Sequence, residues 1–163
     1  MNIFFLSWNP KEAARLHCDK HVVKMIIESA QLLYSAHWML NSEHLPSYAY
    51  KLAHKNHPCS IWVRQSLQNY LWLCMLAWHL CKEFTYRYEK VHKTQLHVEW
   101  LMLNPPKSIP DIPMTIPAQA MPIEYKREDT IVAYQTFYRE SKYRIRKIVA
   151  YRKREFPEFL TKE

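Results

Sequence analysis

Apolar and polar positions alternate with a helical period along much of the chain, most clearly between Pro10 and Leu40. Residues 10–40 predict one long helix that is apolar around most of its circumference and therefore needs burial on several sides. A single polar stripe interrupts this surface, formed by His17, His21, Lys24, Glu28, Gln31 and Ser35. Because charged groups are costly to bury unless they are paired or hydrated, we expect the stripe to line a cleft. The alternative is an ordinary solvent-facing stripe, closed by an ion pair between Lys24 and Glu28.

The rest of the chain predicts two further long helices, at about 60–88 and about 130–152. Residues 104–122, between them, hold most of the ten prolines, so no helix or central strand can run through this segment. Asn9 is a plausible N-cap for the first helix, with Pro10 in its first turn, and Asp129 or Thr130 caps the last. These patterns predict a mainly α fold: a compact single-domain helical bundle over residues 1–163, with a proline-rich extended loop.

The amino-acid composition favours some classes of partner and binding site and excludes others. The chain has 163 residues, 48% of them hydrophobic, which is enough for one core, and a formal net charge of +8 that favours an anionic partner such as nucleic acid. The absence of glycine excludes P-loops and Rossmann turns, which need glycine for close approach to phosphates. The four cysteines form no C-x-x-C pair and are expected to be reduced core thiols. No signal peptide or membrane-length apolar run is recognised, so we expect a cytoplasmic protein without membrane contact.

The predicted last helix combines basic and aromatic side chains, a pattern that joins phosphate-binding charge to rings able to stack on bases. A solvated basic face is the alternative interpretation. The candidate nucleic-acid contacts are Arg139, Lys142, Arg144, Arg146, Lys147, Tyr138 and Tyr143 on this helix, together with Lys20, Gln31, His57 and Arg64.

Three kinds of chemistry fit the polar stripe. His17 and His21 are one turn apart, as two ligands of a helical zinc site would be, but the glutamate of H-E-x-x-H is missing. Alternatively, Lys24 or the α-amine of Met1 could attack a sugar carbon of a nucleotide, with Glu28 steering proton transfers. In the third interpretation the stripe recognises a nucleotide or flipped base without catalysis. Asp19 lies on the far side of the helix from His17, and we expect it to form an ion pair.

A family resemblance bears on this choice. The opening M-N-I-F-F, the run P-K-E-A-A-R-L-H-C-D-K-H-V-V-K-M, the N-H-P at Asn56–Pro58, and the later C-K-E-F-T-Y-R-Y and H-K-T-Q resemble endonuclease-V-type pyrimidine-dimer DNA glycosylases of phages, viruses and bacteria. The chain also resembles small viral proteins that share the H-C-D-K-H run. The resemblance spans about the first two thirds of the chain and implies a compact helical fold. It also implies attack by the N-terminal α-amine, a lyase step that nicks the strand, and a kinked duplex with one base flipped out.

Carried onto this sequence, the resemblance matches His17 to a histidine of the family's first helix and Pro10 to the residue that begins that helix. Seven residues after the histidine, where the family has its catalytic glutamate, this chain has Lys24, and Glu28 follows one turn later. Asn2 is bulky, so the free amine is expected to be that of Met1. We therefore predict a DNA glycosylase or abasic-site lyase that binds double-stranded DNA without cofactor or metal. Its catalytic candidates are Met1, Lys24, Glu28, His17 and His21. The alternatives are a non-catalytic nucleic-acid- or nucleotide-binding viral accessory protein and, third, a metal-dependent hydrolase.

Overall fold

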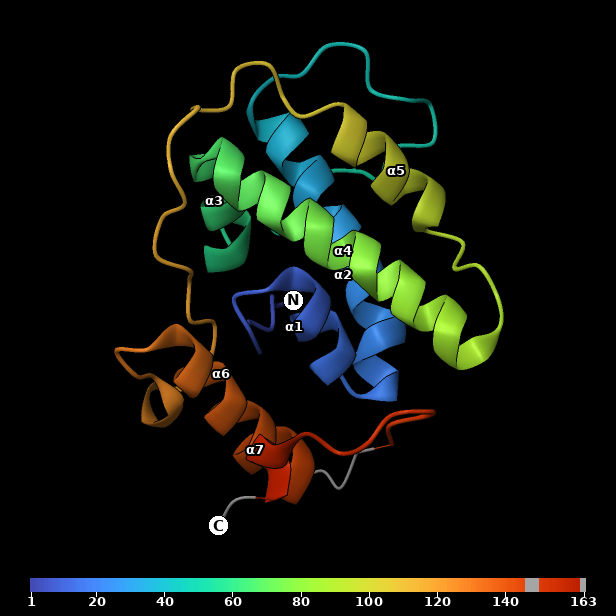
Figure 1. Ribbon diagram of the computed structural model, residues 1–163. Helices are drawn as coiled ribbons and strands as arrows, with labels where there is room; N and C mark the ends of the chain where they lie inside the picture. The colour runs from blue at the N-terminus through green and yellow to red at the C-terminus, as the bar shows by residue number, and fades with distance from the viewer. Residues whose placement is uncertain (146–149, 162–163) are drawn as a thin grey trace.

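Helices form all the regular secondary structure in the part of the chain that this computed structural model describes, residues 1–145 and 150–161 (Figure 1). At positions 142, 144 and 145 only the backbone is described. The elements are α1 (Pro10–Leu16), α2 (Asp19–Met39), α3 (Pro58–Gln65), α4 (Leu67–Tyr88), α5 (Gln95–Leu103), the 3-10 turn η1 (Ile123–Tyr125), α6 (Thr130–Phe137), the π-helix η2 (Tyr138–Ile145) and α7 (Glu158–Thr161). The predicted mainly α, single-domain fold is confirmed.

The two longest helices, α2 and α4, lie at the centre of the molecule, with α4 crossing in front of α2 in Figure 1. Ile26 and Leu33 of α2 and Leu73 and Ala77 of α4 are completely buried. Burying each large aliphatic side chain contributes about 1.5–3 kcal/mol. Helix α1 packs against α4, while α6 and α7 close the end of the molecule where the chain finishes. All four cysteines are buried and unbonded, as predicted.

The predicted helix at 10–40 is in fact two helices, because the chain is extended at His17 and Cys18. The predicted start is confirmed: Asn9 accepts hydrogen bonds from the amides of Lys11 and Glu12, and Pro10 occupies the first turn. Side chains from far along the sequence form hydrogen bonds with the backbone groups that the break leaves without helical partners. The Cys18 amide donates to the hydroxyl of Tyr138, and the Tyr151 hydroxyl donates to the carbonyl of Leu16. These long-range partners outweigh a local pattern that would continue the helix.

The predicted helix at 60–88 is also divided, at Ser66, whose backbone is extended. The Ser66 hydroxyl accepts hydrogen bonds from the amides of Gln68 and Asn69 and so caps α4, while donating toward the carbonyls of Ile112 and Pro113. The proline-rich loop therefore contributes directly to the break.

The last helix is shorter than predicted. Helix α6 begins after Asp129, which caps it as expected, but from Tyr138 the chain continues as η2 to Ile145. Positions 146–149 lie outside the described residues, and 150–154 are not helical. There the chain returns to the junction of α1 and α2: the carbonyl of Ala150 accepts from the Asp19 amide, and the Arg152 amide donates to the Asp19 carboxylate. Tertiary contact again overrides the local helical pattern.

The proline-rich loop is extended, as predicted, and in Figure 1 it runs along the outside of the molecule past α3 to reach α6. Asn69 anchors it by donating to the Thr115 hydroxyl and accepting from the Thr115 amide. The indole of Trp62 donates to the Thr115 carbonyl. Farther along, Ala120 accepts a hydrogen bond from Asn2. The loop thus ends beside the amino terminus.

Candidate functional site

The α-amine of Met1 meets the polar side of α2. It lies 3.8 Å from Oε1 of Glu28, and Nζ of Lys24 lies 3.4 Å from the same oxygen. The Met1 side chain is only 4% exposed and that of Glu28 is 14% exposed, whereas that of Lys24 is 57% exposed. One carboxylate is therefore shared by two amines, and of these two residues Met1 has the more buried side chain.

The residues after Met1 explain why the amine is held there. Residues Ile3–Leu6 are buried in the core, which anchors the chain directly after the amine. Asn2 holds the residue next to the amine in place. Its Nδ2 donates to the Ala120 carbonyl, and its Oδ1 accepts from the Ile3 amide at 2.8 Å. The Tyr134 hydroxyl lies 3.0 Å from the same Oδ1 as a donor, and the Cys59 thiol is a weaker donor to it. Asn2 therefore connects the amino terminus to the proline-rich loop, α3 and α6.

His57 borders the same group of charges. Burial lowers its pKa most, followed by the positive charges of the Met1 amine and His54, while the Glu28 carboxylate acts in the opposite direction. The Nδ1 atom of His57 accepts a hydrogen bond from the Cys59 amide and so caps α3. In the neutral ring the proton must therefore reside on Nε2. From the sequence His57 was assigned as a nucleic-acid contact, and His54 was missed, although the N-H-P motif beside it was visible.

This arrangement has the groups that amine catalysis needs. An α-amino group has a reference pKa of about 7.7–8.0, against about 10.4 for lysine, so more of it is neutral near pH 8. A neighbouring carboxylate can accept its proton and later transfer protons on a bound sugar. Lys24 remains the second amine of the site, and its side chain is the more exposed of the two.

His17 and His21 do not join this group, contrary to the expectation of one stripe in one cleft. The ring of His17 is completely buried, its Nδ1 donates to the Ala13 carbonyl at 2.6 Å, and burial lowers its pKa to about 4. His21 is buried as well, stacked on Phe4 with 4.6 Å between ring centroids. Because the Tyr138 hydroxyl accepts from the backbone, its own proton is free to bond to Nδ1 of His21. Both histidines are packed where α1 and α2 meet, away from solvent.

The predicted nucleic-acid contacts are scattered. Tyr138 is buried and so cannot stack on a base, which corrects the sequence-based assignment; its hydroxyl is needed at the helix break. Arg139 pairs with Glu140 at 2.7 Å, and Arg64 donates to the carbonyl of Lys55. Lys20 is exposed, whereas Gln31 and Tyr143 are half-buried. Arg146 and Lys147 lie outside the described residues, as do the side chains of Lys142 and Arg144.

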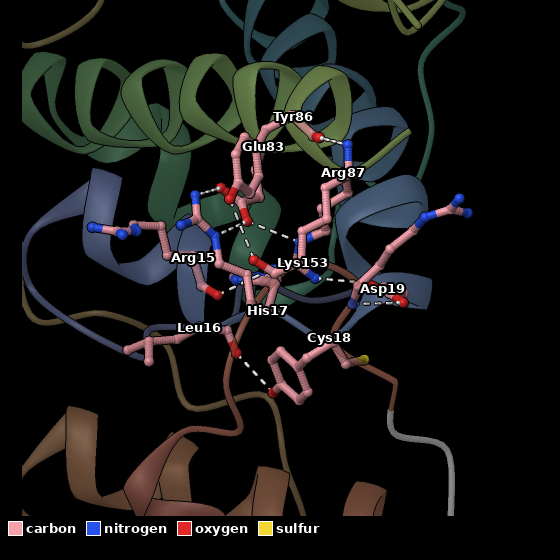
Figure 2. A network of polar contacts seen from close by, with 12 residues as sticks. Arg15, Leu16, His17, Cys18, Asp19, Glu83, Tyr86, Arg87 and Lys153 are labelled. Atoms are coloured by element: carbon pink, nitrogen blue, oxygen red, sulfur yellow. Dashed lines mark hydrogen bonds and ion pairs between the residues drawn. The ribbon is translucent and has the colours of Figure 1, made fainter. Parts of the chain in front are cut away.

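A buried ionic network, which sequence reasoning missed apart from Asp19, joins α1, α2, α4 and the segment after position 150 (Figure 2). Arg87 is completely buried and donates to Glu83 at 2.8 Å and to Asp19 at 2.9 Å. Arg154 contacts both oxygens of Glu83, at 2.8 and 3.0 Å. The predicted ion pair of Asp19 is thus confirmed. The spacing of Glu83 and Arg87 on α4 was the only local signal for the rest.

Two cavities of the described part of the chain lie elsewhere: neither is lined by Met1, Lys24 or Glu28, so neither is the cleft that was expected along the polar stripe. One of about 610 Å³ lies between the end of α2 and the start of the proline-rich loop, and one of about 340 Å³ lies beside the buried network. Among the described residues, no group of three or more His, Cys, Asp or Glu side chains is placed to hold a metal ion. Within the same part of the chain no helix is long and apolar enough to cross a bilayer.

Comparison with known proteins gives no family: no protein-family model, no curated protein and no solved structure matches the chain.

Proposed function

We propose that the protein is a DNA glycosylase and abasic-site lyase whose nucleophile is the α-amine of Met1 and whose catalytic carboxylate is Glu28. The observation that carries the proposal is the 3.8 Å approach of that amine to Glu28 Oε1 in a partly buried setting. The family that the sequence resembles uses an N-terminal amine and a glutamate at the position that Lys24 holds here; in this chain Glu28, one turn farther along α2, is the carboxylate beside the amine. The net charge of +8 suits a nucleic-acid substrate.

The reaction begins when Glu28 takes a proton from the ammonium group of Met1 and the neutral amine attacks C1′ of a nucleotide. The bond between C1′ and the base breaks, its electron pair leaves with the base, and the base takes up the proton that Glu28 holds, which restores the carboxylate. Opening of the sugar ring then gives a Schiff base between the α-amine and C1′. Removal of a C2′ proton by the carboxylate expels the 3′ phosphate, which breaks the strand, and water hydrolyses the Schiff base to restore the amine.

The surrounding residues have supporting roles in this proposal. Lys24 remains partly solvated beside Glu28, where its ammonium group neutralises the carboxylate and can contact a phosphate of the bound strand. Because C1′ of a paired nucleotide is shielded within the duplex, the nucleotide is flipped out toward Met1 before attack. Asn2 positions the nucleophile through its hydrogen bond to Ala120.

Borohydride trapping tests the proposal. Sodium borohydride reduces a Schiff base to a stable secondary amine, so a lyase incubated with abasic-site DNA forms a covalent complex that survives denaturing electrophoresis. We expect trapping by the unmodified protein and loss of at least about 10²-fold in its rate in Glu28→Gln, the range attributed to a general acid–base group. Lys24→Gln, which alters the other amine at the same carboxylate, is expected to keep most of the trapping.

Duplex binding, measured by fluorescence anisotropy, serves as the control, because Glu28→Gln should bind with nearly unchanged affinity. A protein that binds duplex DNA but never forms the covalent complex, on either abasic or ultraviolet-irradiated DNA, refutes the lyase proposal. Trapping that is lost in Lys24→Gln and kept in Glu28→Gln refutes the assignment of roles.

A further inference from the structure

The cavity of about 340 Å³ beside the buried network is strongly basic. Two walls form it: α1 contributes Lys11 and Arg15, and α4 contributes His79, Lys82, Glu83 and Tyr86; Arg154 closes one side. Figure 2 shows Arg15, Glu83 and Tyr86 around this region. His79 is half-buried and lines the cavity.

The one carboxylate in the lining is already neutralised. Glu83 accepts from Arg87 and Arg154, and its side chain is only 5% exposed. The guanidinium carbon of Arg154 lies over the solvent-exposed ring of Tyr86, 4.1 Å from its centroid, so the group is held between the ring and Glu83. Because both oxygens of Glu83 are occupied, this carboxylate cannot also balance the remaining cations of the cavity.

Those remaining cations are Lys11, Arg15 and Lys82, all exposed at the rim. In the described part of the chain none of them lies within ion-pair distance of a carboxylate. Lys82 instead lies over the ring of Trp78, with its Nζ 3.9 Å from the centroid. Lys11 also contributes to lowering the pKa of His79, after burial. Unpaired cations gathered on both sides of one hollow favour an anion between them.

The positions of the cations select the kind of anion. Lys11 and Arg15 are one helical turn apart, about 6 Å along α1, and Lys82 faces them from the other wall. Charges distributed along a trough suit a strand that carries one phosphate per nucleotide, whereas a single small anion is bound best by groups that converge on one point. We propose that this trough, lined by Lys11, Arg15 and Lys82, binds the phosphodiester backbone of DNA outside the reacting nucleotide.

The inference rests on the proposed function for the identity of the polymer, but it can be tested separately from the chemistry. The test compares Lys11→Gln/Arg15→Gln/Lys82→Gln with a control variant that removes three exposed lysines elsewhere, Lys90→Gln/Lys93→Gln/Lys107→Gln. Both variants lose the same formal charge. Affinity for a fluorescent duplex oligonucleotide is measured by anisotropy over a series of salt concentrations, and the thermal unfolding midpoint confirms that both variants are folded.

We expect the trough variant to bind at least about tenfold more weakly, and its log–log salt slope to be flatter by about 2–3, because three phosphate contacts are lost. The control variant should change affinity by less than about threefold, since it alters only long-range attraction. Equal losses in the two variants, or no loss in either, overturn the proposal. So does absence of duplex binding by the unmodified protein.

Two further results distinguish DNA binding by the trough from the lyase proposal and from binding to a membrane surface. If the unmodified protein fails to trap abasic DNA while the trough variant still binds duplex more weakly than the control, the trough stands and the lyase proposal falls. If instead the trough variant loses binding to phosphatidylserine vesicles and keeps its affinity for duplex, the trough recognises a membrane surface and the proposal is wrong.

Discussion

Replacing Asn2 by alanine tests how the amino terminus is held beside Glu28. The substitution removes four hydrogen bonds. The Ala120 carbonyl loses its donor Nδ2, and the Ile3 amide loses Oδ1 and keeps beside it only the sulfur of Cys59, a weak acceptor. Leaving a buried polar group unsatisfied costs about 1–3 kcal/mol. The Tyr134 hydroxyl keeps the carbonyl of Ala118 as an acceptor, and a thiol is a weak donor, so these two contacts add little. We therefore expect the free energy of unfolding to fall by about 2–4 kcal/mol.

Urea denaturation followed by circular dichroism measures this change, and for a chain of this size it corresponds to a fall in the unfolding midpoint of about 4–16 °C. Asn104→Ala is the matched control, because Asn104 is exposed and its side chain donates only to the Trp100 carbonyl. That variant should lose less than about 1 kcal/mol. Below its own unfolding transition Asn2→Ala should also trap abasic DNA more slowly. A variant as stable as the control refutes the proposed role of Asn2.

Three other changes test the rest of the fold. Arg87→Met should lower the free energy of unfolding by about 3–5 kcal/mol, because Glu83 and Asp19 lose a buried partner, measured by the same denaturation experiment. Ser66→Ala should cost about 1–2 kcal/mol, measured as a lower thermal midpoint, because a helix cap and its contact to the proline-rich loop are lost. His17 has a folded pKa of about 4 and an unfolded value near 6.5, so the unfolded chain binds the proton first as pH falls. His17 should by itself contribute a drop in stability of about 3 kcal/mol between pH 6.5 and 4, and His17→Phe should remove that contribution.

Arg87→Met has a control variant, and the pH prediction is checked on the unmodified protein. Arg152→Met removes an exposed guanidinium that contacts the ring of Tyr88, and it should cost less than about 1 kcal/mol. Equal losses in Arg87→Met and Arg152→Met contradict the buried-network account. A stability profile that is flat from pH 6.5 to 4 in the unmodified protein contradicts the assignment of His17 as a buried neutral ring. His37, whose pKa burial also lowers to about 4, contributes to the pH dependence that remains in His17→Phe, together with the other histidines whose pKa burial lowers, His57, His79, His92 and His97.

The helical fold could be predicted from the sequence, because its signals are local: the apolar periodicity, the cap at Asn9 and the prolines of 104–122 each affect only nearby residues. The breaks at Cys18 and Ser66 did not follow, because the groups that satisfy the freed backbone, such as the Tyr138 hydroxyl, come from far along the chain. Local periodicity carries no information about such partners. The same limitation explains the overlong last helix, where contacts to Asp19 hold the segment after position 150 in a non-helical path.

Only the part of the candidate site that lies within one helix was predicted from the sequence, because local periodicity does not indicate long-range contacts. Placing Lys24 and Glu28 on one face required only the helical repeat, and the structure keeps them together. A joint role for the Met1 amine and Glu28 was considered from the sequence, but their approach in space depends on long-range contacts such as the hydrogen bond from Asn2 to Ala120. His17 shares the stripe by angle but lies beyond the break, so its direction differs from that of an unbroken helix. The basic trough combines α1 with α4, a contact that no sequence window contains.

The most direct test of the central claim is to locate the covalent bond in the borohydride-trapped complex. Proteolysis followed by tandem mass spectrometry identifies the residue that carries the reduced sugar, and an intact-mass measurement first establishes that the chain begins with a free Met1 amine. We predict the adduct on the α-amine of Met1. An adduct on Lys24, or on any other lysine, would contradict the account.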